Sequence, residues 1–123
     1  MLRMAVMTPA AMLLLSAAAL AADTAAGQTV FNRCRICHSI EAGGRSVVGP
    51  NLHGVFGRKA GTLDGYAYSE AMKQSGITWD DDSMTKYLKS PRDVVPGGKM
   101  AFPGIKDEAE LANLLAYLHE ATQ

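Results

Sequence analysis

The segment Cys34-Arg35-Ile36-Cys37-His38 constrains this chain more than any other feature of its sequence. Two cysteines spaced in this way lie on one face of a helical turn, so both sulfurs can reach the same flat ligand. C-x-x-C-H is the attachment signal for c-type haem, in which the histidine also supplies an axial nitrogen to the iron. We therefore predict one covalent haem c, attached through Cys34 and Cys37 and ligated by His38.

The alternative interpretation of this segment is a redox-active C-x-x-C pair of the thioredoxin kind. Such a pair belongs in a fold that alternates strands with helices. The sequence shows no such alternation around Cys34 and Cys37. The haem interpretation is therefore favoured.

Met100 is the candidate for the second iron ligand. It lies in the stretch 96–104, which holds two prolines and three glycines and therefore cannot be helical. Most methionines fill gaps in a core, and that role suits Met72 and Met84, which lie in helical stretches. A haem iron held by histidine and methionine is an electron-transfer arrangement. We predict His38 and Met100 as the two metal ligands.

The first 21 residues have the features of a secretory leader. Arg3 provides a positive start, an apolar run follows, and Ala19-Leu20-Ala21 offers a cleavage site. The alternative is an uncleaved anchor, since an apolar run of this length can just span a bilayer. The run is rich in alanine, however, and contains Pro9. We predict a signal peptide at 1–21, export to a bacterial periplasm and a monohaem domain at 22–123.

The composition of the chain excludes several other classes of protein. A chain of this length forms one domain, and its two cysteines are both committed to the haem motif, so no disulfide framework remains. Twelve basic residues against twelve acidic ones provide no broad phosphate-binding surface. This balance argues against a nucleic-acid-binding protein.

Hydrophobic periodicity and capping signals predict four helices and no strand. They cover about 24–36, a segment that begins near Ser69 and ends at Gly76, a segment from the acidic cluster 80–82 to before Pro91, and a segment after Asp107. For the last helix, Asp107 and Glu110 indicate a capping box. Its leucines follow at helical spacing, at Leu111, Leu114, Leu115 and Leu118.

A long glycine-rich stretch, 41–65, separates the first two predicted helices. A structureless loop of this length would argue against a compact domain, unless the loop wraps a cofactor. The fold class predicted from these features is all-α around one haem.

The order and spacing of these blocks resemble class I cytochrome c, in particular its mitochondrial and alphaproteobacterial soluble branch. The resemblance extends from Gly27 to about Thr122 and implies the cytochrome c fold, with three to five helices wrapped around one covalently bound haem. Besides the cysteine motif and the Met100 loop, the matching blocks are Gly27-x-x-x-Phe31-Asn32, Gly49-Pro50-Asn51-Leu52-His53-Gly54, Arg58-Lys59-Ala60-Gly61, Tyr66-x-Tyr68-Ser69, Gly76-Ile77-Thr78-Trp79, Tyr87-Leu88-x-x-Pro91 and Leu114-x-Ala116-Tyr117-Leu118.

The resemblance also implies roles for further residues. The carbonyl of Pro50 would accept the second imidazole N–H of His38, and Tyr87 would lie beside the Met100 sulfur. Hydrogen bonds near the buried haem propionates would come from Arg58, Tyr68 and Trp79. The resemblance implies no iron role for His53, and both His53 and His119 are expected to be solvent-exposed or capping residues.

Four positions depart from the family pattern. Gly98 replaces a common threonine and Met72 a common asparagine, while Asp93 and Glu108 stand where mitochondrial members carry lysine. The basic docking face of those members is therefore expected to be weaker in this chain.

The function implied is that of a soluble periplasmic single-electron carrier, expected to be a monomer. Its donor would be a cytochrome bc-type complex, and its acceptor an oxidase, a reaction centre or another reductase. Two filled axial positions leave no substrate site, so we do not predict an enzyme. The alternatives are an open-site haem sensor or peroxidase, and a dedicated electron acceptor of one periplasmic dehydrogenase.

Overall fold

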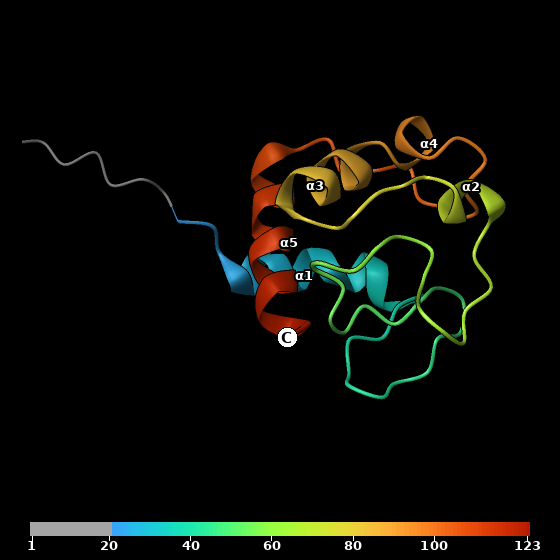
Figure 1. Cartoon of the computed structure of the whole chain (residues 1–123). Coiled ribbons are helices and arrows are strands. Elements are labelled where there is room, and N and C mark those ends of the chain that lie inside the picture. The colour runs from blue at the N-terminus through green and yellow to red at the C-terminus, as the bar shows by residue number, and fades with distance from the viewer. Residues whose placement is uncertain (1–20) are drawn as a thin grey trace, which may run out of the picture.

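The computed structural model describes residues 21–123, so the predicted leader lies, except for Ala21, outside the described residues. In this part of the chain five helices follow one another (Figure 1): α1 (Thr24–Arg35), α2 (Glu70–Lys73), α3 (Asp81–Lys89), α4 (Pro91–Val94) and α5 (Glu108–Ala121). Within 21–123 the β pairing is a single bridge between Lys59 and Thr78. The all-α prediction is confirmed. None of the helices in this part of the chain is long and apolar enough to cross a membrane.

The crossing of α1 and α5 is the most extensive contact between helices among residues 21–123 (Figure 1). Gly27 makes it possible, because a Cβ atom at this position would lie 1.9 Å from the carbonyl oxygen of Asn113. Beyond the crossing, the Phe31 and Tyr117 rings pack with centroids 5.4 Å apart. Leu114, from the predicted leucine stripe, is fully buried. The first and last helices of the described chain, which are far apart in the sequence, are thereby packed against each other.

The N-terminus of α5 corrects one detail of the sequence prediction. Asp107 accepts a hydrogen bond from the Glu110 backbone nitrogen at 2.8 Å, as a helix cap should. The Glu110 carboxylate, however, lies 3.3 Å from Arg33 of α1 instead of returning to the Asp107 backbone. The predicted capping box is therefore only half formed, because an ion pair between helices occupies its second side chain.

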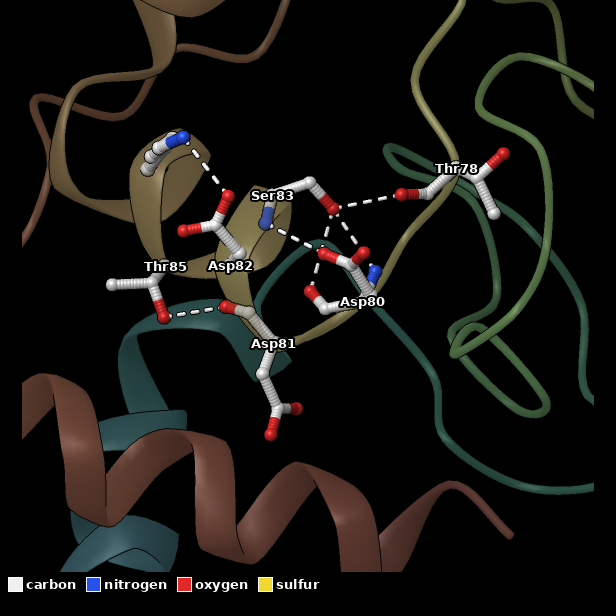
Figure 2. Close-up of polar contacts among 7 residues, drawn as sticks. Thr78, Asp80, Asp81, Asp82, Ser83 and Thr85 are labelled. Carbon is white, nitrogen blue, oxygen red and sulfur yellow. Dashed lines mark hydrogen bonds and ion pairs between the residues drawn. The ribbon is translucent and has the colours of Figure 1, made fainter.

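A complete capping box starts α3 instead (Figure 2). The Asp80 carboxylate accepts from the Ser83 backbone nitrogen at 2.8 Å, and the Ser83 hydroxyl accepts from the Asp80 nitrogen at 2.9 Å. The hydrogen bond that the Ser83 backbone nitrogen donates to this carboxylate is the main cause that lowers the pKa of Asp80. The same hydroxyl donates to the Thr78 carbonyl. The start of α3 is thereby fixed to the segment that pairs with Lys59.

Pro91 separates α3 from a helix that the sequence did not predict. It was expected only to stop the preceding helix, and it also occupies the first position of α4, where a missing N–H costs nothing. The chain then returns along α3, with the Ile105 nitrogen donating to the Leu88 carbonyl at 2.9 Å. Gly104 has φ +105°, and a Cβ there would lie 2.3 Å from the Lys89 oxygen. The loop that carries Met100 is therefore anchored at its far end.

The long stretch between α1 and α2 contains no helix, as predicted, and one side chain organises its first part. Asn51 is buried, and its amide nitrogen donates to the carbonyls of Glu41 and Gly44, each at 2.8 Å. Its amide oxygen accepts from the His53 nitrogen at 2.7 Å. Two hydrogen bonds donated and one accepted by this buried amide fix the turns that lead into and out of Pro50.

His119 connects three parts of the fold near the C-terminus. Its ring stacks on Phe56 with centroids 3.8 Å apart and planes inclined by 15°. Its Nε2 atom also contacts the Asp81 carboxylate of α3. The 41–65 stretch, α3 and α5 therefore meet at this histidine.

Replacing Gly27 by alanine should destabilise the fold without touching the predicted site residues. The added methyl would overlap the Asn113 carbonyl and force α1 and α5 apart, at a cost of about 1–3 kcal/mol. Chemical denaturation of the variant should show this loss, whereas Gln28→Ala, on the exposed face of the same helix, should change stability by less than about 0.5 kcal/mol. Equal stability of the two variants would contradict the close crossing.

Candidate functional site

All the residues predicted to hold the cofactor line one cavity. The cavity is open on one side and receives side chains from α1, α3, α5 and the intervening loops. The predicted site residues on its wall are Cys34, Cys37, His38, Pro50, Arg58, Tyr68, Trp79, Tyr87 and Met100. Much of the remaining wall is apolar and includes Leu52, Val55, Leu88, Leu114 and Leu118. Residues far apart in the sequence are thereby brought to one apolar site.

The cysteine motif forms a tight turn at the end of α1. The backbone nitrogens of Cys37 and His38 both donate to the Cys34 carbonyl, at 3.0 and 2.9 Å. Both thiols are free and partly buried. Burial raises the pKa of the Cys34 thiol, an effect that the neighbouring Arg33 charge opposes. Two free thiols are therefore held one helical turn apart at the cavity.

His38 is fixed by a hydrogen bond from its ring. The Nδ1 atom lies 2.7 Å from the Pro50 carbonyl oxygen, and since a carbonyl can only accept, Nδ1 carries the proton. Burial lowers the pKa of His38, and the bond to Pro50 partly opposes this shift. The imidazole is therefore neutral, and the lone pair on Nε2 is available to a metal.

Gly49 is a site residue to which the sequence analysis assigned no role. A Cβ at this position would lie 2.6 Å from Cε1 of His38 and 2.9 Å from its Nδ1. Its nitrogen also donates to the Cys37 carbonyl at 2.9 Å. Its φ is not positive, so glycine is required here by the imidazole and not by backbone conformation. In the sequence, its place in the family block Gly49-Pro50-Asn51-Leu52-His53-Gly54 could have pointed to it.

Tyr87 distinguishes Met100 from the other methionines of the cavity. Met72 and Met84 also line the wall, so position on the cavity alone does not select the ligand. The Tyr87 hydroxyl lies 3.9 Å from the Met100 sulfur. Burial raises the pKa of Tyr87 to about 12, so this hydroxyl keeps its proton at neutral pH and orients the Met100 thioether.

Arg58, Tyr68 and Trp79 form a polar border of the cavity. The Arg58 guanidinium donates to the Asn51 carbonyl at 3.1 Å, and its own carbonyl accepts from the Trp79 nitrogen at 3.0 Å. Burial lowers the pKa of Arg58 and raises the pKa of the Tyr68 hydroxyl. A partly buried cation beside a phenol would stabilise a carboxylate that reached this border.

These donors fit a haem attached through thioethers. The cavity presents two thiols at the spacing of the attachment motif, one neutral imidazole nitrogen, one oriented thioether and apolar walls for a flat macrocycle. The arginine border suits the propionates of such a group. The chemistry of the cavity and the sequence motif therefore agree.

Comparisons with known proteins all indicate the same family. The family model described as cytochrome c matches residues 24–122. Cytochrome c2 of Blastochloris viridis is 47% identical over 104 residues, which are 85% of this chain and 82% of that protein. Cytochrome c-550 of Bradyrhizobium diazoefficiens is 50% identical over 96 residues, 78% of this chain and 71% of that one.

A solved structure supports the same assignment. Cytochrome cH from Methylobacterium extorquens superposes with a TM-score of 0.75 at 46% identity, covering 80% of this chain and 98% of its own. The cysteine motif of this family implies covalent haem c. Sequence, fold and cavity thus lead to one conclusion: the chain belongs to the cytochrome c family, as a class I electron carrier close to the cytochromes c2 and c-550.

Proposed function

We propose that this protein is a periplasmic carrier of single electrons between a cytochrome bc-type donor and an oxidase, reaction centre or other reductase. The observation that carries the proposal is the pair of oriented side chains on one cavity. His38 is held neutral by Pro50, and the Met100 sulfur is held by Tyr87. We infer that these two residues are the axial ligands.

The residues around the ligands would hold the cofactor. Cys34 and Cys37 supply the thiols that become thioethers, and Arg58, Tyr68 and Trp79 border the place for the propionates. When bound, the haem supplies the one-electron Fe(III)/Fe(II) couple. The chain contributes a neutral nitrogen, a thioether and a low-dielectric wall, and together these set the potential of that couple.

Two filled axial positions distinguish a carrier from an open-site haem protein. The protonated Tyr87 hydroxyl orients the Met100 sulfur. This sulfur can therefore bind the iron and leave no axial position for a substrate. This arrangement favours a carrier over the sensor or peroxidase alternative. A dedicated acceptor of one dehydrogenase would use the same site and differ only in its partner.

The fold also supports the proposed boundary at residue 21. The Asp23 nitrogen donates to the Asn113 side chain at 2.8 Å, and the Asp23 carboxylate caps α1. Asp23 is thus part of the packed domain among residues 21–123. We expect that removal of the signal peptide 1–21 keeps these contacts of Asp23.

Methionine substitutions test the ligand set. In Met100→Ala the sulfur–iron charge-transfer band of the ferric protein should disappear, and the potential should fall by a sizeable part of the ~0.8 V range that axial ligands span. Met72→Ala and Met84→Ala, on the same cavity, should keep the band. Visible spectroscopy with redox titration checks this. Loss of the band in either control, with Met100→Ala unaffected, would refute Met100 as the ligand. A wild-type protein without the band would contradict the filled sixth position and with it the carrier proposal.

Substituting Gly49 tests the position of His38. The methyl group of Gly49→Ala should push against the imidazole and weaken or tilt its bond to iron, which shifts the Soret band and the potential. Gly43→Ala is the matched control, because Gly43 has φ +73° but has no neighbour within 4 Å of an added Cβ. The control should lose about 1–2 kcal/mol of stability through strain alone, with an unchanged spectrum. Identical spectra for both variants would argue against a steric role of Gly49.

The mass of the intact protein tests export and haem attachment together. Protein purified from cells that mature c-type cytochromes should have the mass of residues 22–123 plus one haem, and acid extraction should not release the haem, because thioether bonds survive it. A mass that includes 1–21 would contradict cleavage. A haem that is released by acid would contradict attachment through Cys34 and Cys37.

A further inference from the structure

The loop that carries Met100 contains almost no polar side chains. Among residues 97–104, Lys99 is the only one whose side chain can donate a hydrogen bond. Gly98 stands where the family commonly has threonine, so a hydroxyl is missing at this position. Any side-chain hydrogen bond donated by this segment must therefore come from Lys99.

The backbone of the loop does not fix Met100 either. In the described part of the chain, the backbone of 99–103 forms no hydrogen bond outside the loop. Its one backbone hydrogen bond is internal, from the Phe102 nitrogen to the Met100 carbonyl at 3.0 Å. Polar contacts with other segments are therefore left to two side chains, the Tyr87 hydroxyl near the Met100 sulfur and Lys99.

Lys99 reaches across to a different loop. Its ammonium group donates to the Ala67 carbonyl and lies 4.8 Å from the centre of the Tyr66 ring. A hydrogen bond from a charged donor is stronger than one between neutral groups, and an ammonium over an aromatic ring is attracted by the negative face of that ring. We call these two contacts, to Ala67 and to Tyr66, the Lys99 clamp.

The ring under the ammonium is itself held on two sides. The Tyr66 hydroxyl donates to the Val48 carbonyl at 3.0 Å. The same ring meets Tyr68 edge-on, with centroids 4.8 Å apart and planes inclined by 85°. The Lys99 clamp therefore connects the Met100 loop to a segment that is fixed by contacts of its own.

Resting on the ligand set proposed above, we propose that Lys99 is a positioning residue for Met100 and that the Lys99 clamp sets how readily small external ligands replace the Met100 sulfur at the iron. Such a ligand can enter the sixth position only after the sulfur has left. Because the loop must move for the sulfur to leave, both contacts of the clamp are broken in the open loop. The clamp therefore lowers the population of the open loop, although Lys99 itself does not touch the iron.

The test measures how fast imidazole binds to the ferric, haem-loaded protein at neutral pH. In Lys99→Leu both contacts are lost, so binding should be about tenfold faster. The sulfur–iron band of this variant should still be present before imidazole is added. Lys99→Arg keeps a cation and hydrogen-bond donors and should restore most of the wild-type behaviour.

A double variant tests whether Lys99 and Tyr66 act together. Tyr66→Leu removes the ring under the ammonium and should also accelerate binding of imidazole. Adding Lys99→Leu to Tyr66→Leu should then change the rate by a smaller factor than Lys99→Leu does in wild type. Such non-additivity is expected of residues that are in contact.

Two control variants separate the clamp from other causes. Lys106→Leu removes the same charge and a similar contact, because the Lys106 ammonium donates to the Lys89 carbonyl. Lys106 lies beyond the Ile105 anchor of the loop, however. Gly27→Ala weakens the crossing of α1 and α5 and tests for an effect of general instability. Both controls should bind imidazole at the wild-type rate.

Three outcomes would overturn the clamp. Lys99→Leu could bind imidazole at the wild-type rate, Lys106→Leu or Gly27→Ala could accelerate binding equally, or the effects of Lys99→Leu and Tyr66→Leu could multiply as independent factors. A different result would refute the ligand set instead. A wild-type protein that lacks the sulfur–iron band and binds imidazole without delay would contradict Met100 as the ligand and the carrier function, on which the clamp rests.

Discussion

The hydrogen bond from His38 to the Pro50 carbonyl is the contact on which the site depends. It keeps the proton on Nδ1 and leaves Nε2 free. The bond exists only because the chain after α1 turns back on itself, with the Asn51 amide holding the carbonyls of Glu41 and Gly44. Gly49 leaves space for the ring. A stretch that looks unstructured in the sequence is therefore the support of the imidazole.

The two halves of the site are carried by different parts of the fold. The crossing of α1 and α5 at Gly27 fixes the end of α1, where the cysteine turn begins. On the other side, α3 provides Tyr87 and the loop anchored at Ile105 provides Met100. Much of the wall between them is apolar, so a macrocycle in this space would complete the core as well as carry the electron. Folding and cofactor binding are in this sense one process.

The parts that could be predicted from sequence are those set by local signals or by the family resemblance. The cysteine motif is local, and Asp23, Asp80 and Asp107 each begin a helix. The other features depend on contacts between residues that are far apart in the sequence. Glu110 pairs with Arg33 instead of completing a box, and His119 meets Phe56 and Asp81. The requirement for Gly49 also follows from a contact through space. Such contacts leave little trace in one sequence. Met100, in contrast, was predicted from its loop of prolines and glycines, and Pro50 from the family resemblance.

A crystal structure of the haem-loaded protein, with anomalous scattering at the iron edge, tests the central claim most directly. The account predicts one iron bound by Nε2 of His38 and the sulfur of Met100, with Nδ1 still within hydrogen-bond distance of the Pro50 oxygen. It would be contradicted by a ligand other than Met100, such as Met72 or Met84, by an open sixth position, or by an imidazole turned away from Pro50.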